Sequence, residues 1–415
     1  EQKEDLKAVF EGRTKLWKSL DYVTGWFMKA ADYGTHVPSS STAFVATNSI
    51  CQGQQVPILW SLIFRTGHEI CFAHTSFKWA NLASHNAGVT VVIVGMSGRA
   101  GPGRRLYVPG EGGKTLVRAC DNINAYLVAG PDIRIAKRTK PLGPVGEMIR
   151  GNMPVDGGHL LLNRAEMMAL GLTPEQKARF IRLFLGSAEF IQGRLRYCLW
   201  IEDEHLQEAM DIAPIRERVE KVRQVRLASR DRGANRMAAR SHQMREMNTG
   251  KHQTIIVPGV SSENREYLPC GLLPPGATVS NKIFALYDAP LWNLALIASR
   301  LHLVWIGAVC GKLKTDFRYS NTLGWNTFPV PFLTEKNRTD LTRCAIDILL
   351  AREAHFPDTI AELYEPDNMP ANLRAAHDFN DEKVERIFIG RRFKNDSERL
   401  EKLFTIYTKM TAGAT

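Results

Sequence analysis

The stretch Val89-Thr90-Val91-Val92-Ile93-Val94-Gly95 decides the fold of the first part of the chain. It is β-branched almost throughout and apolar on both faces, which is typical of a strand in the buried middle of an α/β sheet. Ahead of it, Ala43 to Asn48 and Glu69 to Thr75 are runs of strand length. Apolar residues with helical spacing precede these runs, over 20–31 and 56–63. The order helix, strand, helix, strand, strand predicts the second half of a nucleotide-binding-type sheet.

The pattern changes beyond a Gly-rich stretch, Gly98 to Gly113. Three short apolar runs there, over 125–128, 197–201 and 254–257, lie between basic loops and helical segments. We expect the run over 125–128 to be a strand. One long helix is expected from about Pro290 to Val309. From residue 335 helical patterns dominate, over 341–354, 381–389 and 400–410. We therefore expect an α/β domain over 1–118, an α+β domain over 119–332 and a small helical domain over 333–415.

The composition narrows the function to partners that carry negative charge. The 415 residues have a net charge of +11 and a pI near 9.3, which favours nucleic acid first and an anionic membrane second. No stretch approaches the roughly 18 to 20 apolar residues of a membrane helix, and the first residues do not form a signal peptide. The seven cysteines are scattered without a CxxC pair, which indicates reduced thiols and argues against a metal site.

Two glycine motifs suggest nucleotide binding but do not meet its requirements. Gly112-Gly113-Lys114-Thr115 lacks the earlier glycine of a phosphate loop, since that position is Val108. The glycines at 98, 101 and 103 follow a strand as in a dinucleotide turn, but no helical pattern comes after them. A plain surface connection is the better interpretation of both.

Basic residues gather in two places. Arg134, Lys137, Arg138 and Lys140 lie within seven residues beside two prolines, which is typical of a loop that contacts phosphates. The segment 216–245 contains ten Lys or Arg against three acids. For this second segment a solvated helix face is an equally good interpretation.

The segment Gly311 to Ser320 follows the helix expected over 290–309. If it is extended, Lys314, Asp316 and Arg318 point the same way at a period of two. Lys or Arg can donate to guanine O6 and N7, and Asp can accept from cytosine N4 in the major groove. The alternative is a surface ladder of salt bridges.

Several strings, in this order along nearly the whole chain, closely resemble the MmeI-like (type IIL) restriction–modification proteins. These are single chains that join a nuclease, an adenine-N6 DNA methyltransferase and a target-recognition domain. The strings are Ala46–Val56, Phe72–Asn81, Lys140-Pro141-Leu142, Gly151–Leu160, Val260-Ser261-Ser262-Glu263, Arg318-Tyr319-Ser320 and Asn326-Thr327-Phe328-Pro329.

The resemblance implies a fold and an activity for the full-length parent. The fold is the second half of a Rossmann-like methyltransferase sheet, then an α+β target-recognition domain and a helical C-terminal domain. The activity is transfer of a methyl group from S-adenosylmethionine to N6 of a flipped adenine. The family's Asn-Pro-Pro-aromatic motif and Gly-rich donor loop have no counterpart here, since the one Pro-Pro is Pro274-Pro275. We therefore expect no catalytic residue in this chain, which starts after the catalytic loop, and no catalysis by it alone.

By the same resemblance, Asn48, Phe77 and Trp79 are expected to line the pocket for the flipped base, with ordinary core packing as the alternative. Lys314, Asp316 and Arg318 are expected to read bases, Lys314 on a guanine and Asp316 on the paired cytosine. The expected partner is double-stranded DNA rather than a membrane, in the cytoplasm of a bacterium and associated with the nucleoid. Two other functions stay open: a stand-alone DNA-binding module that gives specificity to a partner, and an RNA-binding protein. A-form RNA does not offer the major-groove edges that Lys314 and Asp316 would read.

Overall fold

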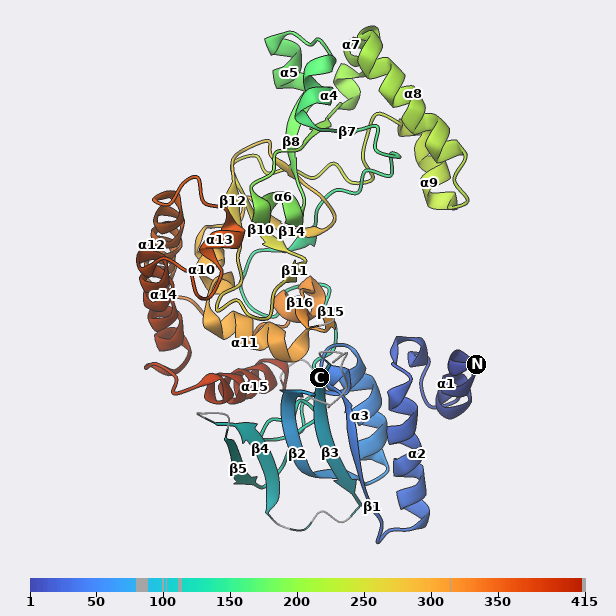
Figure 1. Ribbon diagram of the computed structural model, residues 1–415, viewed down its shortest axis with the longest axis vertical. Helices are drawn as coiled ribbons and strands as arrows, with labels where there is room; N and C mark the ends of the chain where they lie inside the picture. Colours follow the sequence, from blue (N-terminus) through green and yellow to red (C-terminus); the bar gives the residue numbers. More distant parts are fainter. Residues whose placement is uncertain (80–88, 99–100, 102, 111–113, 314, 413–415) are drawn as a thin grey trace, which may run out of the picture. The chain divides into compact units, whose positions relative to one another are not determined.

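The computed structural model describes residues 1–79, 89–98, 101, 103–110, 114–313 and 315–412. It forms two compact units, each assembled from separate stretches of the chain (Figure 1). The first unit consists of Glu1–Pro144, Arg300–Leu333 and Glu385–Thr415, and the second of Val145–Ser299 and Thr334–Val384. In the part of the chain that is described, no helix is long and apolar enough to cross a membrane.

A five-stranded sheet forms the centre of the first unit, in the order β1-β3-β2-β4-β5. Its strands are β1 (Ser41–Thr47), β2 (Glu69–Lys78), β3 (Thr90–Ser97), β4 (Arg104–Pro109) and β5 (Thr115–Cys120). β3 pairs antiparallel with β1 on one side and with β2 on the other, so β1 and β2 run parallel to each other. Val92, Val94 and Met96 of β3 are buried. The prediction that the stretch from Val89 forms a buried middle strand is confirmed.

Helices pack on this sheet through large side chains. The unit begins with α1 (Gln2–Phe10), the short η1 (Trp17–Ser19) and α2 (Val23–His36), and α3 (Gln55–Arg65) connects β1 to β2. Phe27 of α2 is fully buried, with its ring 4.7 Å from that of Phe44 and 6.0 Å from that of Trp60. The helices expected over 20–31 and 56–63 are therefore present, and both bury an aromatic side chain.

The Gly-rich stretch leads into two further strands that the sequence did not predict. β4 pairs parallel with β2, and β5 pairs antiparallel with β4. Five of the six residues of β5 are exposed, so the strand has no buried apolar face whose alternating pattern would predict it from the sequence. Because β4 and β5 are strands, neither Gly98–Gly103 nor Lys114-Thr115 leads into the helix that a nucleotide-binding turn requires.

The remaining stretches of the first unit form a second layer around Trp305. They contain α11 (Arg300–Val309), the hairpin of β15 (Lys312–Leu313) and β16 (Asp316–Arg318), a π-helical turn (Asn321–Trp325) and α15 (Asp396–Ala412). The Trp305 ring lies 5.8 Å from Phe404 and 5.9 Å from Tyr407, both on α15. The single helix expected over 290–309 is wrong: α10 (Trp292–Ile297) ends before α11 begins. The Ser299 hydroxyl at the break donates to the Leu296 carbonyl at 2.7 Å, a bond that competes with helix continuation.

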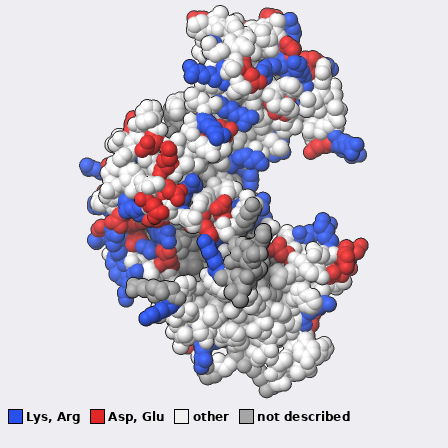
Figure 2. Space-filling view, in the orientation of Figure 1, with Lys and Arg blue, Asp and Glu red and all other residues white. Residues whose placement is uncertain are grey.

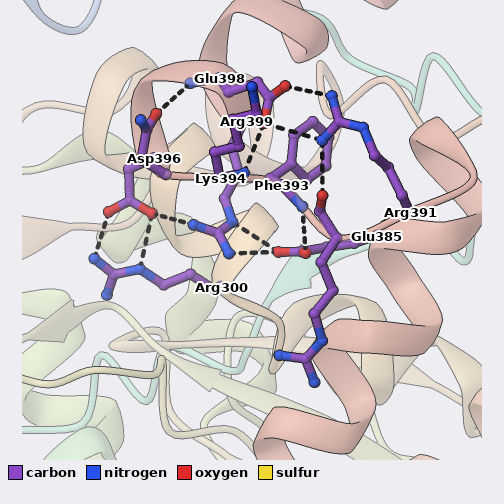
Figure 3. Close-up of polar contacts among 10 residues, drawn as sticks. Arg300, Glu385, Arg391, Phe393, Lys394, Asp396, Glu398 and Arg399 are labelled. Carbon is purple, nitrogen blue, oxygen red and sulfur yellow. Dashed lines mark hydrogen bonds and ion pairs between the residues drawn. The ribbon is translucent and has the colours of Figure 1, made fainter.

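A network of charged groups fixes the start of α15 in the first unit (Figure 3). Asp396 accepts from Arg300 at 2.6 Å and from Arg399 at 2.8 Å, and Arg399 also pairs with Glu385 at 2.6 Å. The second carboxylate oxygen of Glu385 accepts from the Phe393 backbone N–H at 2.9 Å. Burial alone would raise the pKa of Asp396, but the guanidiniums of Arg300 and Arg399 hold it below its ordinary value.

The second unit contains two four-stranded sheets, in the orders β12-β10-β14-β6 and β13-β8-β9-β7. The strands are β6 (Ile149–Arg150), β7 (Leu161–Leu162), β8 (Ile181–Leu185), β9 (Tyr197–Leu199), β10 (Thr254–Pro258), β12 (Gly271–Leu273), β13 (Thr278–Val279) and β14 (Ile283–Tyr287), with the short β11 at Val260–Ser261. β9 and β10 fall in two of the three apolar runs. The strand expected at 125–128, in the first unit, is wrong. There Asn124 Oδ1 accepts from the Tyr126 N–H at 2.9 Å, and Leu127 has a φ of 56°. The four residues therefore form a buried turn.

Helices complete the second unit. The shorter ones are α4 (Arg164–Ala169), α5 (Pro174–Phe180), α6 (Ser187–Gln192), η4 (Asp203–His205), α7 (Leu206–Asp211), α9 (Arg232–Arg236), η5 (Met237–Arg240) and α13 (Ile360–Leu363). The longer ones are α8 (Ala213–Leu227), α12 (Glu335–Glu353) and α14 (Ala371–Ile389), of which the last residues belong to the first unit. The helical character predicted from residue 335 on is therefore present, but these helices are divided between the two units.

Candidate nucleic-acid interface

Asp21 anchors the loop that follows β1. Its carboxylate accepts from the Gln55 amide at 2.7 Å and from the Ser49 hydroxyl at 2.8 Å, while its backbone N–H donates to Gln55 Oε1 at 2.6 Å. The Trp60 indole donates to the Ile50 carbonyl at 2.8 Å. The turn η2 (Asn48–Cys51) and the start of α3 are thus held in one conformation at the carboxyl end of β1, where open α/β sheets bind ligands.

The three residues predicted for the base pocket lie at this end of the sheet. Thr47 of β1 and Phe77 of β2 both pair with Val91 of β3, so Asn48 and Phe77 flank the start of the same strand. Two strand spacings separate β1 from β2, which is roughly 10 Å. Trp79 follows directly, 41% exposed, with its ring 6.4 Å from that of Phe77.

Asn48 is the most enclosed of the three, at 7% exposed. Its Nδ2 is buried without a hydrogen-bond partner among the described residues. A buried donor that lacks a partner costs free energy unless a ligand or water meets it. Core packing alone does not account for an amide in this position.

An aromatic row continues from Phe77 along the sheet. The His74 ring lies 6.4 Å from Phe77 and stacks on Tyr107 at 4.2 Å with an interplanar angle of 7°. Burial lowers the pKa of His74, which favours its neutral form. Sequence reasoning did not single out His74 or Tyr107, because β4 was not predicted and the two residues meet only through the β2–β4 pairing.

The basic segment 134–140 is an irregular stretch of chain fixed to the first unit. Ile133 and Ile135 are buried while Arg134 is exposed between them. The Arg138 backbone N–H donates to the Thr322 carbonyl at 3.0 Å, and its carbonyl accepts from the buried Asn326 amide at 2.9 Å. The segment therefore has a fixed backbone that presents its cations outward.

The cations of this segment differ in their partners. Lys137 donates to Gln54 in the loop after β1. Arg134 and Lys140 are exposed and make no ion pair with any described residue. The Nε of Arg138 is buried and has no hydrogen-bond partner in the part of the chain that the structure describes. Arg134 and Lys140 are thus available to phosphate oxygens.

The segment predicted as one extended run is a hairpin. Lys312 pairs with Phe317 and Leu313 with Asp316, so the chain reverses between Leu313 and Asp316. The extended run expected over Gly311 to Ser320 is therefore wrong, because the chain reverses within it, and a period-two alignment is described only on β16. Asp316 and Arg318 keep that alignment on β16, the first half-buried and the second exposed. Lys314 lies outside the described residues.

The hairpin is supported from both ends. The Arg318 N–H donates to the Gly311 carbonyl at 3.0 Å, and the buried Tyr319 hydroxyl shares a 2.9 Å hydrogen bond with His302 Nε2 on α11. Burial lowers the pKa of His302 to about 3, so the imidazole is neutral at physiological pH. No sequence motif singles out this histidine, which lies within an apolar helical pattern.

The pocket loop and the hairpin approach each other at two glycines. A Cβ on Gly53 would lie 3.2 Å from the Gly311 nitrogen, and Gly53 has a φ of +68°, which glycine adopts readily. Together with the Lys137–Gln54 hydrogen bond, this contact brings the residues predicted for base pocket, phosphates and base reading into one region of the first unit. The first unit therefore combines an α/β sheet with an exposed basic segment and a β-hairpin that carries Asp316 and Arg318.

Comparison with known proteins identifies the family. Residues 1–108 match the DNA-methyltransferase domain of MmeI, 129–332 its target recognition domain and 333–415 its C-terminal domain. The chain belongs to the MmeI-like (type IIL) restriction–modification family, and the resemblance found in the sequence is confirmed.

Two relatives cover almost the whole chain. DNA methyltransferase A of Bacillus subtilis (strain 168) is 41% identical over 412 residues, which are 99% of this chain and 46% of that protein. The solved structure of the type IIL restriction–modification enzyme MmeI in complex with DNA is 33% identical with a TM-score of 0.85, over 99% of this chain and 55% of that one. The chain therefore spans about half the length of these relatives.

Proposed function

We propose that this chain supplies DNA sequence recognition within a site-specific adenine-N6 DNA methyltransferase of a restriction–modification system. The observation that carries the proposal is the meeting of the loop after β1, the basic segment 134–140 and the hairpin 311–318 in the first unit. The partner is double-stranded DNA, and its setting is the bacterial cytoplasm beside the nucleoid. The domain boundaries at 118 and 332 are part of the proposal, supported by family matches that change at 108–129 and at 332–333.

Each part of the region has its own task in this proposal. Phe77 and Trp79 offer apolar surface to a base that has lost its stacking in the duplex. Asn48 offers a buried amide donor to the edge of that base. Arg134, Lys137, Arg138 and Lys140 hold the backbone without reading sequence.

Base reading belongs to the hairpin. The Asp316 carboxylate accepts from a cytosine N4 amino group, Lys314 donates to the paired guanine, and Arg318 provides a forked donor for a neighbouring base or phosphate. A half-buried carboxylate suits this task, because it excludes water on one side and keeps the acceptor exposed on the other.

The topology of the sheet supports our proposal that residues 1–118 are the second half of a Rossmann-like methyltransferase domain. β1, α3 and β2 form a parallel strand–helix–strand unit, with the antiparallel β3 inserted between the strands. In the full-length protein S-adenosylmethionine would supply the methyl group. The 415 residues hold no Asn-Pro-Pro-aromatic string, and the glycines after β3 lead into a strand. These residues do not by themselves fit a donor site, and we expect this chain alone to bind DNA without methylating it.

Selection from a random duplex library tests the recognition. The chain is incubated with the library and the bound fraction is sequenced after several rounds. We expect one short motif that contains at least one invariant G·C pair to be enriched. Enrichment of no motif, with salt-dependent binding retained, would contradict sequence recognition.

A second assay tests whether this chain alone can transfer a methyl group or needs further residues to do so. The selected duplex is incubated with the chain and radiolabelled S-adenosylmethionine, and label on the DNA is counted. We expect none. Label on adenine N6 would overturn the view that this chain needs further residues to act, and label on cytosine would overturn adenine as the target.

A further inference from the structure

The basic run 216–245 in the second unit contains two kinds of cation, those with partners inside the unit and those without partners among the described residues. Seven of its ten Lys and Arg side chains bind groups within the unit. Arg216 donates to the Met210 carbonyl at 2.8 Å, Arg218 pairs with Glu166 at 3.0 Å, Lys221 with Glu217 at 2.7 Å, Arg223 with Glu220 at 3.5 Å and Arg245 with Glu246 at 2.7 Å; Arg226 and Arg240 donate to backbone carbonyls. These seven are accounted for by the fold.

The other three are Arg230, Arg232 and Arg236. All are exposed, and none forms an ion pair or hydrogen bond with any residue that the structure describes. They fall within seven residues, on the turn after α8 and on α9. Figure 2 shows Lys and Arg side chains at the end of this unit, where Figure 1 labels α9. Cations this close repel one another, so a polyanion that binds them relieves the repulsion.

The backbone that carries these arginines is fixed at its base. The fully buried Arg226 guanidinium donates to five carbonyls: Pro154 and Val155 before the run, and Met237, Arg240 and Gln243 after the turn. Burial, the first cause, and the charge of Arg240 lower its pKa to about 10. Arg226 thus ties both ends of the segment 227–240 to the body of the unit.

The turn itself is also ordered by hydrogen bonds. Asp231 Oδ1 accepts from the N–H groups of Gly233 and Ala234 at 2.6 and 3.2 Å and caps α9. The Asn235 amide donates to the Leu227 carbonyl at 2.9 Å. Asp231 is the one acid between 228 and 236, and its carboxylate is engaged by the backbone rather than by an arginine.

An ordered backbone that carries three unpaired arginines matches what phosphate binding requires. The guanidinium fork fits a phosphate with two parallel hydrogen bonds, and a backbone fixed beforehand lowers the entropy lost on binding. Gly233 and Ala234 between the arginines have no long side chain to keep a phosphate backbone away.

We propose that Arg230, Arg232 and Arg236 form a second contact surface for the backbone of duplex DNA, in the second unit and separate from the basic segment 134–140 of the first. The proposal rests on the proposed function, since it takes the same DNA as partner. The surface adds affinity and length of contact and does not read sequence.

Salt dependence tests the proposal against a charge-matched control. The first variant is Arg230→Gln/Arg232→Gln/Arg236→Gln. The control is Arg216→Gln/Lys221→Gln/Arg223→Gln, which removes the same three charges from cations that already have partners. Binding of a labelled duplex by the full chain is measured by fluorescence anisotropy from low to high KCl. We expect the slope of log K against log salt to fall by roughly 2 to 3 in the first variant and by less than about 1 in the control, at about 0.9 per phosphate contact.

Hydroxyl-radical footprinting on the same duplex adds a readout that depends on position. The first variant is expected to lose some of the protected phosphates, with the preferred sequence kept. Equal slopes in variant and control, or an unchanged set of protected phosphates, would overturn the surface while leaving the proposed function intact. Absence of DNA binding by the unaltered chain would overturn both. Tight binding of the unaltered chain to anionic vesicles, with no footprint on DNA, would assign the surface to a membrane instead.

Discussion

Asp316 and Arg318 are the two described side chains to which we assign base reading. They project from the same side of β16, one half-buried and one exposed, and the backbone between them is fixed by hydrogen bonds to Gly311 and, through Tyr319, to His302. Substitution of a reading side chain therefore changes the donor or acceptor without moving the strand. We therefore expect substitutions in the hairpin to change specificity and substitutions in the basic segment to change affinity.

Removal of both polar groups from the hairpin is expected to relax one base pair. In Lys314→Ala/Asp316→Ala, discrimination at one G·C position should fall by about 1–3 kcal/mol, the worth of a good base contact. Competition binding against the four single-base variants of the selected site measures it. The matched control is Leu313→Ala, an exposed side chain of the same hairpin without a hydrogen-bonding group. An unaltered preference in the double variant refutes the assignment of Lys314 and Asp316 as readers.

Replacement of cations in the basic segment by neutral side chains should weaken the binding of every DNA sequence equally. Arg134→Ala/Lys140→Ala removes two exposed cations without ion-pair partners among the described residues. We expect the slope of log K against log salt to fall by roughly 2, with the selected motif unchanged. Lys3→Ala/Lys15→Ala removes the same charge from exposed positions of the first unit and serves as the control. If the two variants have equal slopes, the segment does not contact phosphates.

His302 should make the first unit sensitive to mild acid. Burial lowers its pKa to about 3, while the unfolded chain has the ordinary value near 6.5. Between these values the unfolded state binds the proton and the folded state does not. The stability is therefore complete above about pH 6.5 and falls as the pH decreases, by up to about 1.4 kcal/mol per pH unit.

Urea unfolding from pH 7 to 5 measures this slope. His302→Gln should flatten it by that amount. Tyr319→Phe removes the hydrogen bond but leaves the imidazole buried, so it should keep the slope even where it lowers the overall stability. A His302→Gln variant with the slope of the unaltered chain would show that other groups control the acid response.

At the scale of elements, the first unit depends on the packing of α15 against α11. Phe404 and Tyr407 pack on Trp305, and the ion-pair network of Figure 3 ties the start of α15 to Arg300 and to Glu385 at the end of α14. Since the hairpin follows α11 directly, we expect any loosening of α15 to affect Asp316 and Arg318 through that helix.

Loss of Glu385 should destabilise this packing strongly. Its side chain is 2% exposed and accepts from both Arg399 and the Phe393 backbone, so Glu385→Ala leaves the buried Phe393 N–H without its acceptor and leaves the Arg399 guanidinium with Asp396 as its remaining acidic partner. We expect a loss of about 1–3 kcal/mol in the free energy of unfolding, measured by urea titration of Trp fluorescence. Glu398 belongs to the same network, but its ion pair with Arg391 is more exposed. Glu398→Ala should therefore lower the free energy of unfolding clearly less. Similar losses for both acids would mean that the network does not act through burial.

At the scale of the whole molecule, the sequence predicts those strands and helices that have a regular pattern of apolar residues. The strands around 41–47, 69–78 and 90–97 and the helix between the first two were predicted, because each has a strong apolar pattern. β4 and β5 were missed because β5 is exposed on both faces. The hairpin was taken for one extended strand, since a short reversal of the chain interrupts no apolar pattern.

Contacts between distant stretches were beyond local reasoning. The Lys137–Gln54 hydrogen bond joins residues 83 apart in the chain, and Gly53 meets Gly311 from another stretch altogether. The residue types of the site could be named from the sequence, because donors and acceptors on one strand and cations in one loop have recognisable spacing. Their assembly into one region could not, because three separate stretches of chain build the first unit.

That division of the first unit also has a consequence for the protein while it is being made. The stretch with β1 to β5 is synthesised before the first stretch of the second unit; the hairpin follows, and the second stretch of the second unit is made between the hairpin and α15. Until α15 emerges, seconds later at ordinary rates of synthesis, Trp305 lacks its contacts with Phe404 and Tyr407. A nascent chain that ends before α15 thus already contains the basic segment and the hairpin, but its α11 is not yet packed against α15.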